Sequence, residues 1–337
     1  MVTKKLIPHT QNAITVSGTN KSGKNEHIFA SQKMVSELTA ASAATEADMD
    51  ALVIKLSVLE QKIAALKQTN PTAVTPSADA NYEQPDADLV ISGGETIKTN
   101  TAIKGASVTL TEVSTDSVTI NITTDGEVVL DGYQSSGSID GSKNHAQLNV
   151  MSNDHVTVKN CTFGQSGYNG IQFGVSGTTP KSITIEDCVI DGDMTNNTFN
   201  VYGHADGCII TLKNVHFKGK SSNPLRFGNA ENTKATVNVI NCKFDHWESG
   251  SPWQGCICLQ DHVAKSVEEA AERNVFASEK MKFSFVNCYG PGNKKIDFTD
   301  MDPKLWLASD DSVQFAYIFA KEIVPYDESR YPGFSFK

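Results

Sequence analysis

The chain has 337 residues and a formal net charge of −10 at pH 7, with 39 acidic and 29 basic side chains. This balance argues against general binding of nucleic acid, because the nucleic-acid backbone is polyanionic. No stretch approaches the roughly 18 apolar residues of a membrane span, and the N-terminal residues lack the apolar run of a signal peptide. We therefore expect no membrane insertion and no export through a cleaved leader.

Residues 1–33 are polar and contain only short apolar pieces, which do not make a domain by themselves. A segment of this composition is expected to order against a partner surface, and its charge favours an acidic one. A solvated, mobile arm is the alternative interpretation. The basic residues of this segment are Lys4, Lys5, Lys21, Lys24 and Lys33.

Residues 34–68 carry a heptad repeat. Its second half, from Met49 to Leu66, is apolar at every a and d position, whereas the first half is Ala-rich with polar Ser42 and Thr45. Such a seam is buried only against partner helices, so we predict an α-helical coiled-coil stalk, with an amphipathic helix packed on the protein's own body as the alternative. The heptad does not fix the number of helices. The predicted trimerisation residues are Val35, Leu38, Met49, Leu52, Leu56, Leu59, Ile63 and Leu66.

Residues 69–88 contain Pro71, Pro76 and Pro85 and no hydrophobic periodicity, which predicts a linker. The following residues 89–129 hold short strand-like runs broken by Gly and Asp. We interpret them as irregular first coils and a cap for the body that follows, because the end of a stacked β structure has to be covered.

One phrase then recurs at a fixed period. Residues 156–163, 183–190, 210–217 and 237–244 read VTVKNCTF, ITIEDCVI, ITLKNVHF and VNVINCKF, and their first residues are 27 positions apart. A fifth copy, FSFVNCYG at 283–290, begins 46 residues after the fourth. Fixed periods of about 20–50 residues are typical of solenoids, and the alternation within each copy predicts a strand with one buried face.

The alternation slips by one residue in the middle of each copy, which predicts a corner between two strands. Asn and Asp tolerate the left-handed backbone conformation that such a corner requires. Stacked coils lie about 4.8 Å apart, so the corner side chains are expected to form a ladder. The predicted ladder residues are Asn160, Asp187, Asn214, Asn241 and Asn287. The predicted fold is mainly β: a right-handed parallel β-helix of 27-residue coils over residues 89–300, preceded by the coiled-coil stalk.

Four of the seven cysteines share one inward position of the repeat. These are Cys161, Cys188, Cys242 and Cys288, and Val215 takes their place in the third copy. A position that accepts Val selects a small buried apolar group, so we predict reduced core thiols, with disulfides or a metal site as the alternative. We expect no cofactor and no metal.

Two segments depart from the repeat. Residues 261–274 have helical periodicity and predict a helical insertion that packs over the stack or seals its end. Residues 301–337 are rich in aromatic side chains. They predict a C-terminal cap or intersubunit plug, or alternatively a tip that binds a glycan or receptor.

Three carboxylates are weak catalytic candidates. Glycoside hydrolysis requires two carboxyl groups facing one site, and Asp191 and Asp193 in IDGDM, with Asp206 in GHADG, are the best placed. GHADG resembles the Gly-His-Gly element of pectin-degrading β-helices, but the Arg-x-Lys of that family does not follow it. A purely structural role is the alternative, because Asp beside Gly is common in turns.

The order of segments, together with the Asn-Cys pairs at 160–161, 241–242 and 287–288, resembles trimeric bacteriophage fibres and tailspikes. The resemblance implies a homotrimer that is part of the virion, bound to a capsid or tail protein through residues 1–33, and able to adhere to a host glycan or receptor. We expect a non-enzymatic head fibre, decoration or small tail fibre. The alternative is a tailspike that cleaves polysaccharide as a hydrolase or lyase. A secreted cellular adhesin would be expected to carry an export signal.

Overall fold

The computed structural model describes residues 17–19, 25–27, 73–136, 146–228, 233–246, 255–261, 263–269, 280–297, 301–307, 313–319 and 334–336. The chain divides into two units, Met1–Asn70 and Pro71–Lys337. In the first unit, β1 (Ser17–Thr19) pairs antiparallel with β2 (Asn25–His27). The predicted stalk and all eight predicted trimerisation residues, from Val35 to Leu66, lie outside the described residues.

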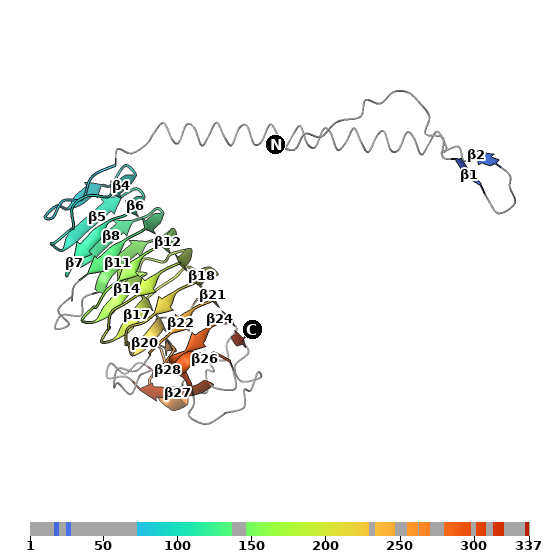
Figure 1. Ribbon diagram of the computed structural model, residues 1–337. Helices are drawn as coiled ribbons and strands as arrows, with labels where there is room; N and C mark the ends of the chain where they lie inside the picture. Colours follow the sequence, from blue (N-terminus) through green and yellow to red (C-terminus); the bar gives the residue numbers. More distant parts are fainter. Residues whose placement is uncertain are drawn as a thin grey trace. The chain divides into compact units, whose positions relative to one another are not determined.

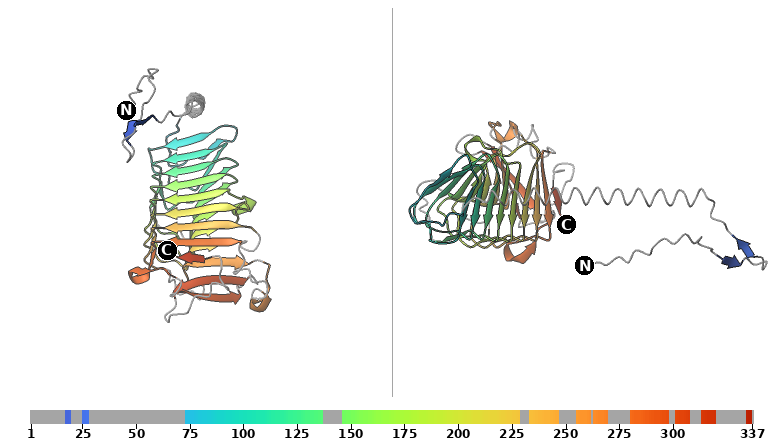
Figure 2. Two further views of the ribbon diagram at one scale, coloured as in Figure 1. Left: turned by 90° about the vertical axis from the view of Figure 1, so that its right-hand side faces the viewer. Right: turned by 90° about the horizontal axis from the view of Figure 1, so that it is seen from above.

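The second unit is mainly β, as predicted, and the chain visits three sheets in turn (Figures 1 and 2). The nine-stranded sheet contains β4 (Leu89–Ser92), β6 (Val108–Thr111), β9 (Val128–Asp131), β12 (His155–Lys159), β15 (Ser182–Glu186), β18 (Cys208–Lys213), β21 (Ala235–Ile240), β24 (Met281–Val286) and β29 (Phe334–Phe336). The eight-stranded sheet contains β7 (Ser114–Asp116), β10 (Gln134–Ser136), β13 (Thr162–Phe163), β16 (Val189–Ile190), β19 (His216–Phe217), β22 (Lys243–Phe244), β25 (Tyr289–Gly290) and β26 (Lys294–Lys295). The ten-stranded sheet contains β3 (Tyr82–Gln84), β5 (Thr101–Gly105), β8 (Ile120–Thr124), β11 (Ala146–Ser152), β14 (Asn169–Phe173), β17 (Asn197–Val201), β20 (Asn223–Phe227), β23 (Ile257–Asp261), β28 (Val313–Phe319) and β27 (Met301–Leu307).

Neighbouring strands from β4 to β24 are parallel within each sheet, so each circuit of the chain lies on the previous one. We call this arrangement the coil stack. Side chains alternate between its interior and its surface, as the burial of every second residue in β6, β9 and β15 shows. The interior is apolar and includes a stacked pair of rings, Phe217 and Phe244, whose centroids are 4.5 Å apart.

Residues in register along the nine-stranded sheet give the length of each coil. They are Leu89, Val108, Val128, Val156, Ile183, Ile210, Val237 and Phe283. The first two coils therefore have 19 and 20 residues, the third has 28, the next three have 27, and the last has 46. The expectation of irregular coils over residues 89–129 is wrong, because these coils are regular but shorter.

The extra residues of the long coils lie at the two ends of the ten-stranded sheet. Compared with the coil that starts at Val108, the coil that starts at Val156 has three more residues before this sheet and four more after it. The second of these additions holds a short 3-10 helix, Val175–Gly177. Lengthening therefore changes the surroundings of the ten-stranded sheet and leaves the other two sheets in register.

Both ends of the coil stack differ from the boundaries expected from sequence. Val74 bridges to Ile91 and β3 pairs with β5, so the predicted 69–88 linker is already part of the stack from Val74 onward. At the other end, β28 pairs antiparallel with both β23 and β27, and β29 adds to β24. β27 and β28 thus form the end of the ten-stranded sheet (Figure 1), and β29 is the last strand of the nine-stranded sheet. Residues 267–269 of the predicted insertion are helical, and residues 262 and 270–274 lie outside the described residues.

Candidate functional site

The five predicted corner residues occupy one column of the coil stack. Asn160, Asp187, Asn214, Asn241 and Asn287 have φ between 52° and 55°. The same column continues into the first three coils as Gly93, Glu112 and Gly132, which also have positive φ. The left-handed conformation is thus a property of the corner throughout the stack, and the amide side chain is confined to the longer coils.

Hydrogen bonds between side chains connect the corner column. Asn287 donates to Asn241 at 2.9 Å, Asn241 donates to Asn214 at 3.3 Å, and Asn214 donates to Asp187 at 2.8 Å. The run ends at Asp187 because an ionised carboxylate has no hydrogen to donate. Asn160 instead donates to Asp131 at 2.8 Å, and this bond together with Lys159 lowers the pKa of Asp131.

All seven cysteines are buried free thiols. Those that follow the corner column donate through Sγ to the carbonyl two residues earlier, as from Cys161 to Lys159 at 3.0 Å. A hydrogen bond with Cys188 and burial raise the pKa of Cys161, and burial alone raises the pKa of Cys208 to about 12. A thiol that stays protonated is a poor nucleophile, so Cys161 and Cys208 serve the core.

The three candidate carboxylates do not converge. Asp191 and Asp193 follow β16, whereas Asp206 lies beyond β17 at the opposite edge of the ten-stranded sheet. The five residues of β17 span about 16 Å, which exceeds the roughly 5–9.5 Å between the catalytic carboxyl groups of glycosidases. Asp206 therefore cannot pair with either of the other two.

Each of these carboxylates also has a partner one coil later. Asp193 accepts the backbone N–H of Lys220 at 2.8 Å, and Asp206 accepts that of Lys234 at 2.8 Å. Asp191 pairs with the ammonium group of Lys218 at 3.2 Å. A Cβ atom at Gly192, between the first two, would collide with the backbone of the preceding coil. This arrangement is that of a tight structural turn.

His204, adjacent to Asp206 in GHADG, is buried in the turn after β17. Its Nδ1 lies 3.1 Å from the carbonyl oxygen of Ala205, and its Nε2 lies 3.2 Å from Oγ1 of Thr233. Burial lowers the pKa of His204, because the charged imidazolium loses its hydration. The neutral ring joins two successive coils.

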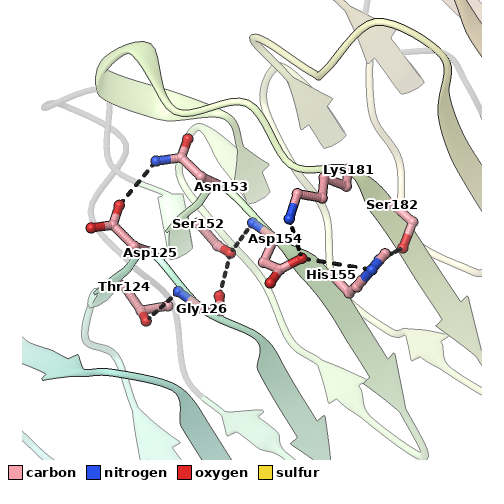
Figure 3. A network of polar contacts seen from close by, with 9 residues as sticks. All are labelled: Thr124, Asp125, Gly126, Ser152, Asn153, Asp154, His155, Lys181 and Ser182. Atoms are coloured by element: carbon pink, nitrogen blue, oxygen red, sulfur yellow. Dashed lines mark hydrogen bonds and ion pairs between the residues drawn. The ribbon is translucent and has the colours of Figure 1, made fainter. Parts of the chain in front are cut away.

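A polar network on the same edge of the stack has the residue types of a hydrolase site (Figure 3). Nδ1 of His155 lies 2.7 Å from Oγ of Ser182, and Nε2 lies 3.6 Å from Asp154. The second distance is too long for a hydrogen bond, and Asp154 pairs at 3.1 Å with Lys181, which lowers its pKa. The His155 side chain is 58% exposed. The network connects neighbouring coils and lacks the sheltered geometry of a nucleophilic site.

The outer face of the ten-stranded sheet holds the most unusual group of polar side chains. Register places one outward residue per coil in an outer column: Asn121, Asn149, Gln172, Asn200, Arg226 and Cys258. The first two are half-buried, whereas Gln172 is 7% exposed and Asn200 is fully buried. Enclosure of this column therefore begins at Gln172, in the coil that starts at Val156, whereas Asn121 and Asn149 keep exposed surface.

Arg226 and Asn200 form the centre of this face. Nη1 of Arg226 donates to Oδ1 of Asn200 at 2.8 Å, and the guanidinium lies 5.1 Å from the ring centroid of Tyr202. Nδ2 of Asn200 is buried without a hydrogen-bond partner in the described part of the chain. No ion pair among the described residues includes Arg226.

Sequence reasoning did not single out Asn200, Tyr202 or Arg226. A signal was present, because NGIQFG, FNVYG and NPLRFG were recognisable as equivalent strands, in which Gln172, Asn200 and Arg226 occupy the same outward position. Another signal was that Arg226 is the one arginine in the part of the chain that the structure describes.

Within the described residues, no group of three or more His, Cys, Asp or Glu side chains is arranged to hold a metal ion. Nor does any helix in these ranges have the length and apolar character needed to cross a membrane. No protein-family model, curated protein or solved structure matches the chain.

Proposed function

We propose that this chain is a homotrimeric appendage of a bacteriophage virion, either a head fibre or decoration or a small tail fibre. The coil stack is its right-handed parallel β-helical body, and residues 34–68 are a coiled-coil stalk. Residues 1–33 attach it to a capsid or tail protein, and the body is free to adhere to a host glycan or receptor. It is assembled in the host cytoplasm.

The observation that carries this proposal is the combination of a long, regular coil stack with a heptad segment in a separate unit. The stack repeats one corner conformation from Gly93 to Asn287 and is closed by antiparallel strands. The unit boundary lies between Asn70 and Pro71, directly after the heptads. A stalk that needs partner helices, followed by a stiff body, is suited to a fibre.

A structural role is favoured over polysaccharide cleavage by the contacts of the candidate carboxylates. Asp193 and Asp206 accept backbone N–H groups, and Asp191 pairs with a lysine. To test this, purified protein is incubated with host capsule and new reducing ends or unsaturated sugars are measured. We expect none. Cleavage that Asp191→Asn or Asp193→Asn abolishes would establish the depolymerase instead.

The oligomer and its location are tested separately. Light scattering should give about three times the chain mass of 36.4 kDa, and deletion of residues 34–68 should weaken the assembly. A monomer at micromolar concentration would refute the stalk. Labelling of whole particles with an antibody against the coil stack should mark the virion surface, and unlabelled particles would argue against attachment.

A further inference from the structure

The outer face around Arg226 has more hydrogen-bond donors than acceptors. The guanidinium group has five N–H groups, one of which is directed at Oδ1 of Asn200. Asn200 itself has an unpartnered Nδ2 and no exposed surface. The single acceptor between these two side chains is therefore already used, and at least one buried donor remains unsatisfied.

The charge on this face is also uncompensated. Arg226 is half-buried and, within the described part of the chain, has no carboxylate within ion-pair distance, although the chain as a whole has a net charge of −10. Partly buried charges and buried donors without partners are costly, so they are usually paired. An anion with two acceptor oxygens would compensate the charge of Arg226 and accept its remaining N–H groups.

We propose that Arg226, Asn200 and Tyr202 form a binding site for a carboxylate group. The planar guanidinium fork matches the two oxygens of a carboxylate, and such bidentate pairs are among the stronger hydrogen-bonded contacts. Asn200 positions the fork through Oδ1, and the carboxylate binds to the N–H groups on the exposed side of the guanidinium. The ring of Tyr202 lies 5.1 Å from the guanidinium carbon and stabilises the cation.

The carboxylate can belong to a small organic acid or to an acidic saccharide. Asn121, Asn149 and Gln172 continue the same outer column away from Asn200, one per coil. Amide groups at a spacing of about 4.8 Å offer both donors and acceptors to successive hydroxyl groups. This neighbourhood favours the acidic saccharide. The inference does not depend on the oligomeric state or on attachment to a virion.

Isothermal titration of the full-length chain tests the site with three probes: trigalacturonate, the neutral trisaccharide of galactose, and glutarate. We expect trigalacturonate to bind, with an affinity that falls as salt is added, and the neutral trisaccharide to bind much more weakly. Glutarate binding as tight as trigalacturonate binding would assign the site to small acids. Absence of binding by both carboxylates at millimolar concentration would overturn the proposal.

Variants of the two central residues separate a binding role from a packing role. Arg226→Gln should weaken trigalacturonate binding at least about tenfold, because a hydrogen-bonded charge pair is lost. Arg226→Lys should bind with intermediate affinity, since it keeps the charge and loses the fork. Lys234→Gln, which removes an exposed cation from a neighbouring turn, is the matched control and should bind as the wild type does.

Asn200→Asp provides the internal test. It supplies Arg226 with a carboxylate from the chain itself, so it should abolish ligand binding while raising the melting temperature. Binding that persists in Asn200→Asp or in Arg226→Gln would place the ligand elsewhere and refute the site. A trimer bound to virions that shows no carboxylate affinity would overturn this inference and leave the proposed function standing.

Discussion

The short coils that begin at Leu89 and Val108 and the long coils that begin at Val156, Ile183 and Ile210 use the same corner and the same inward positions. They differ in the seven or eight residues that the long coils add at the two edges of the ten-stranded sheet. A coil can therefore change its size without losing register, provided that its corner and its inward alternation are kept. Residues can therefore be inserted beside the ten-stranded sheet without changing the register of the other two sheets.

The interior also differs along the stack. On the eight-stranded sheet, the inward position holds Ile97, Thr115 and Ser135 in the first three coils, the third of which already has 28 residues. From the coil that starts at Val156 onward, the equivalent residues are Phe163, Ile190, Phe217 and Phe244. Large apolar side chains fill this position throughout the later coils to the density expected of a protein interior.

The outer face of the ten-stranded sheet differs between the two regions as well. Ala102 and Asn121 on the short coils are half-buried, whereas Asn200, in register with them on a long coil, is fully buried. The buried polar side chains of the proposed carboxylate site therefore lie on the long coils. The following predictions test this contrast, in order of decreasing expected effect.

The largest expected effect is that of Phe217→Ala in a long coil. Phe217 is buried between Phe244 and Phe199, with ring centroids 4.5 and 5.4 Å away. Truncation should lower the free energy of unfolding by about 3–5 kcal/mol, measured by chemical denaturation. Thr115→Ala, at the equivalent position of a short coil, should cost about 1 kcal/mol because it loses one hydrogen bond, to Tyr133. Equal costs would contradict the difference in filling.

The next effect is that of Asn214→Ala at the corner. Asn214 has φ 54° and hydrogen bonds to both Asp187 and Asn241. Alanine in this conformation is strained and makes neither bond, so the free energy of unfolding should fall by about 2 kcal/mol. Asn214→Gly relieves the strain and loses only the bonds, so it should cost less. If glycine cost more than alanine, the left-handed corner would not be the cause.

A smaller effect of opposite sign is expected from Glu112→Gly in a short coil. Glu112 is exposed and has φ 53° without an amide side chain to stabilise it. Glycine should raise the free energy of unfolding by about 0.5–1 kcal/mol, because the relief of strain exceeds the entropy that glycine loses on folding. Thermal melting of the variant beside the wild type measures it, and a lower melting temperature would refute it.

The smallest expected effect is a dependence of folding stability on pH. It arises in the long coils, because residues 73–136 contain no histidine. The folded-state pKa of His204 is lowered by burial, so the unfolded chain takes up the proton first as pH falls. Stability present above about pH 6.5 should therefore be lost progressively below it. His204→Asn should reduce that loss, and His246→Asn, an exposed control, should leave it unchanged. Identical pH profiles for wild type and His204→Asn would show that His204 does not contribute.

The corner column shows which residues a local sequence pattern can predict and which it cannot. Five of its eight residues could be predicted, because Asn or Asp beside an inward small residue recurs every 27 positions. Gly93, Glu112 and Gly132 could not, since neither their side chains nor the 19- and 20-residue spacing match that phrase. The strand β3 could not be predicted either, because it lies among the prolines of the predicted linker. It is held by backbone pairing with a later coil, which its own sequence does not indicate.

The sequence by itself determined the alternation of the strands, the amide corners and the small inward position that holds the cysteines. These features depend on residues within one coil, where side-chain direction and backbone preference are local properties. Only the tertiary structure decided that Asn200, Tyr202 and Arg226 meet, and that Asp191 and Asp193 are engaged by the next coil. Those contacts join residues about one coil apart, so they depend on the length of every turn between them.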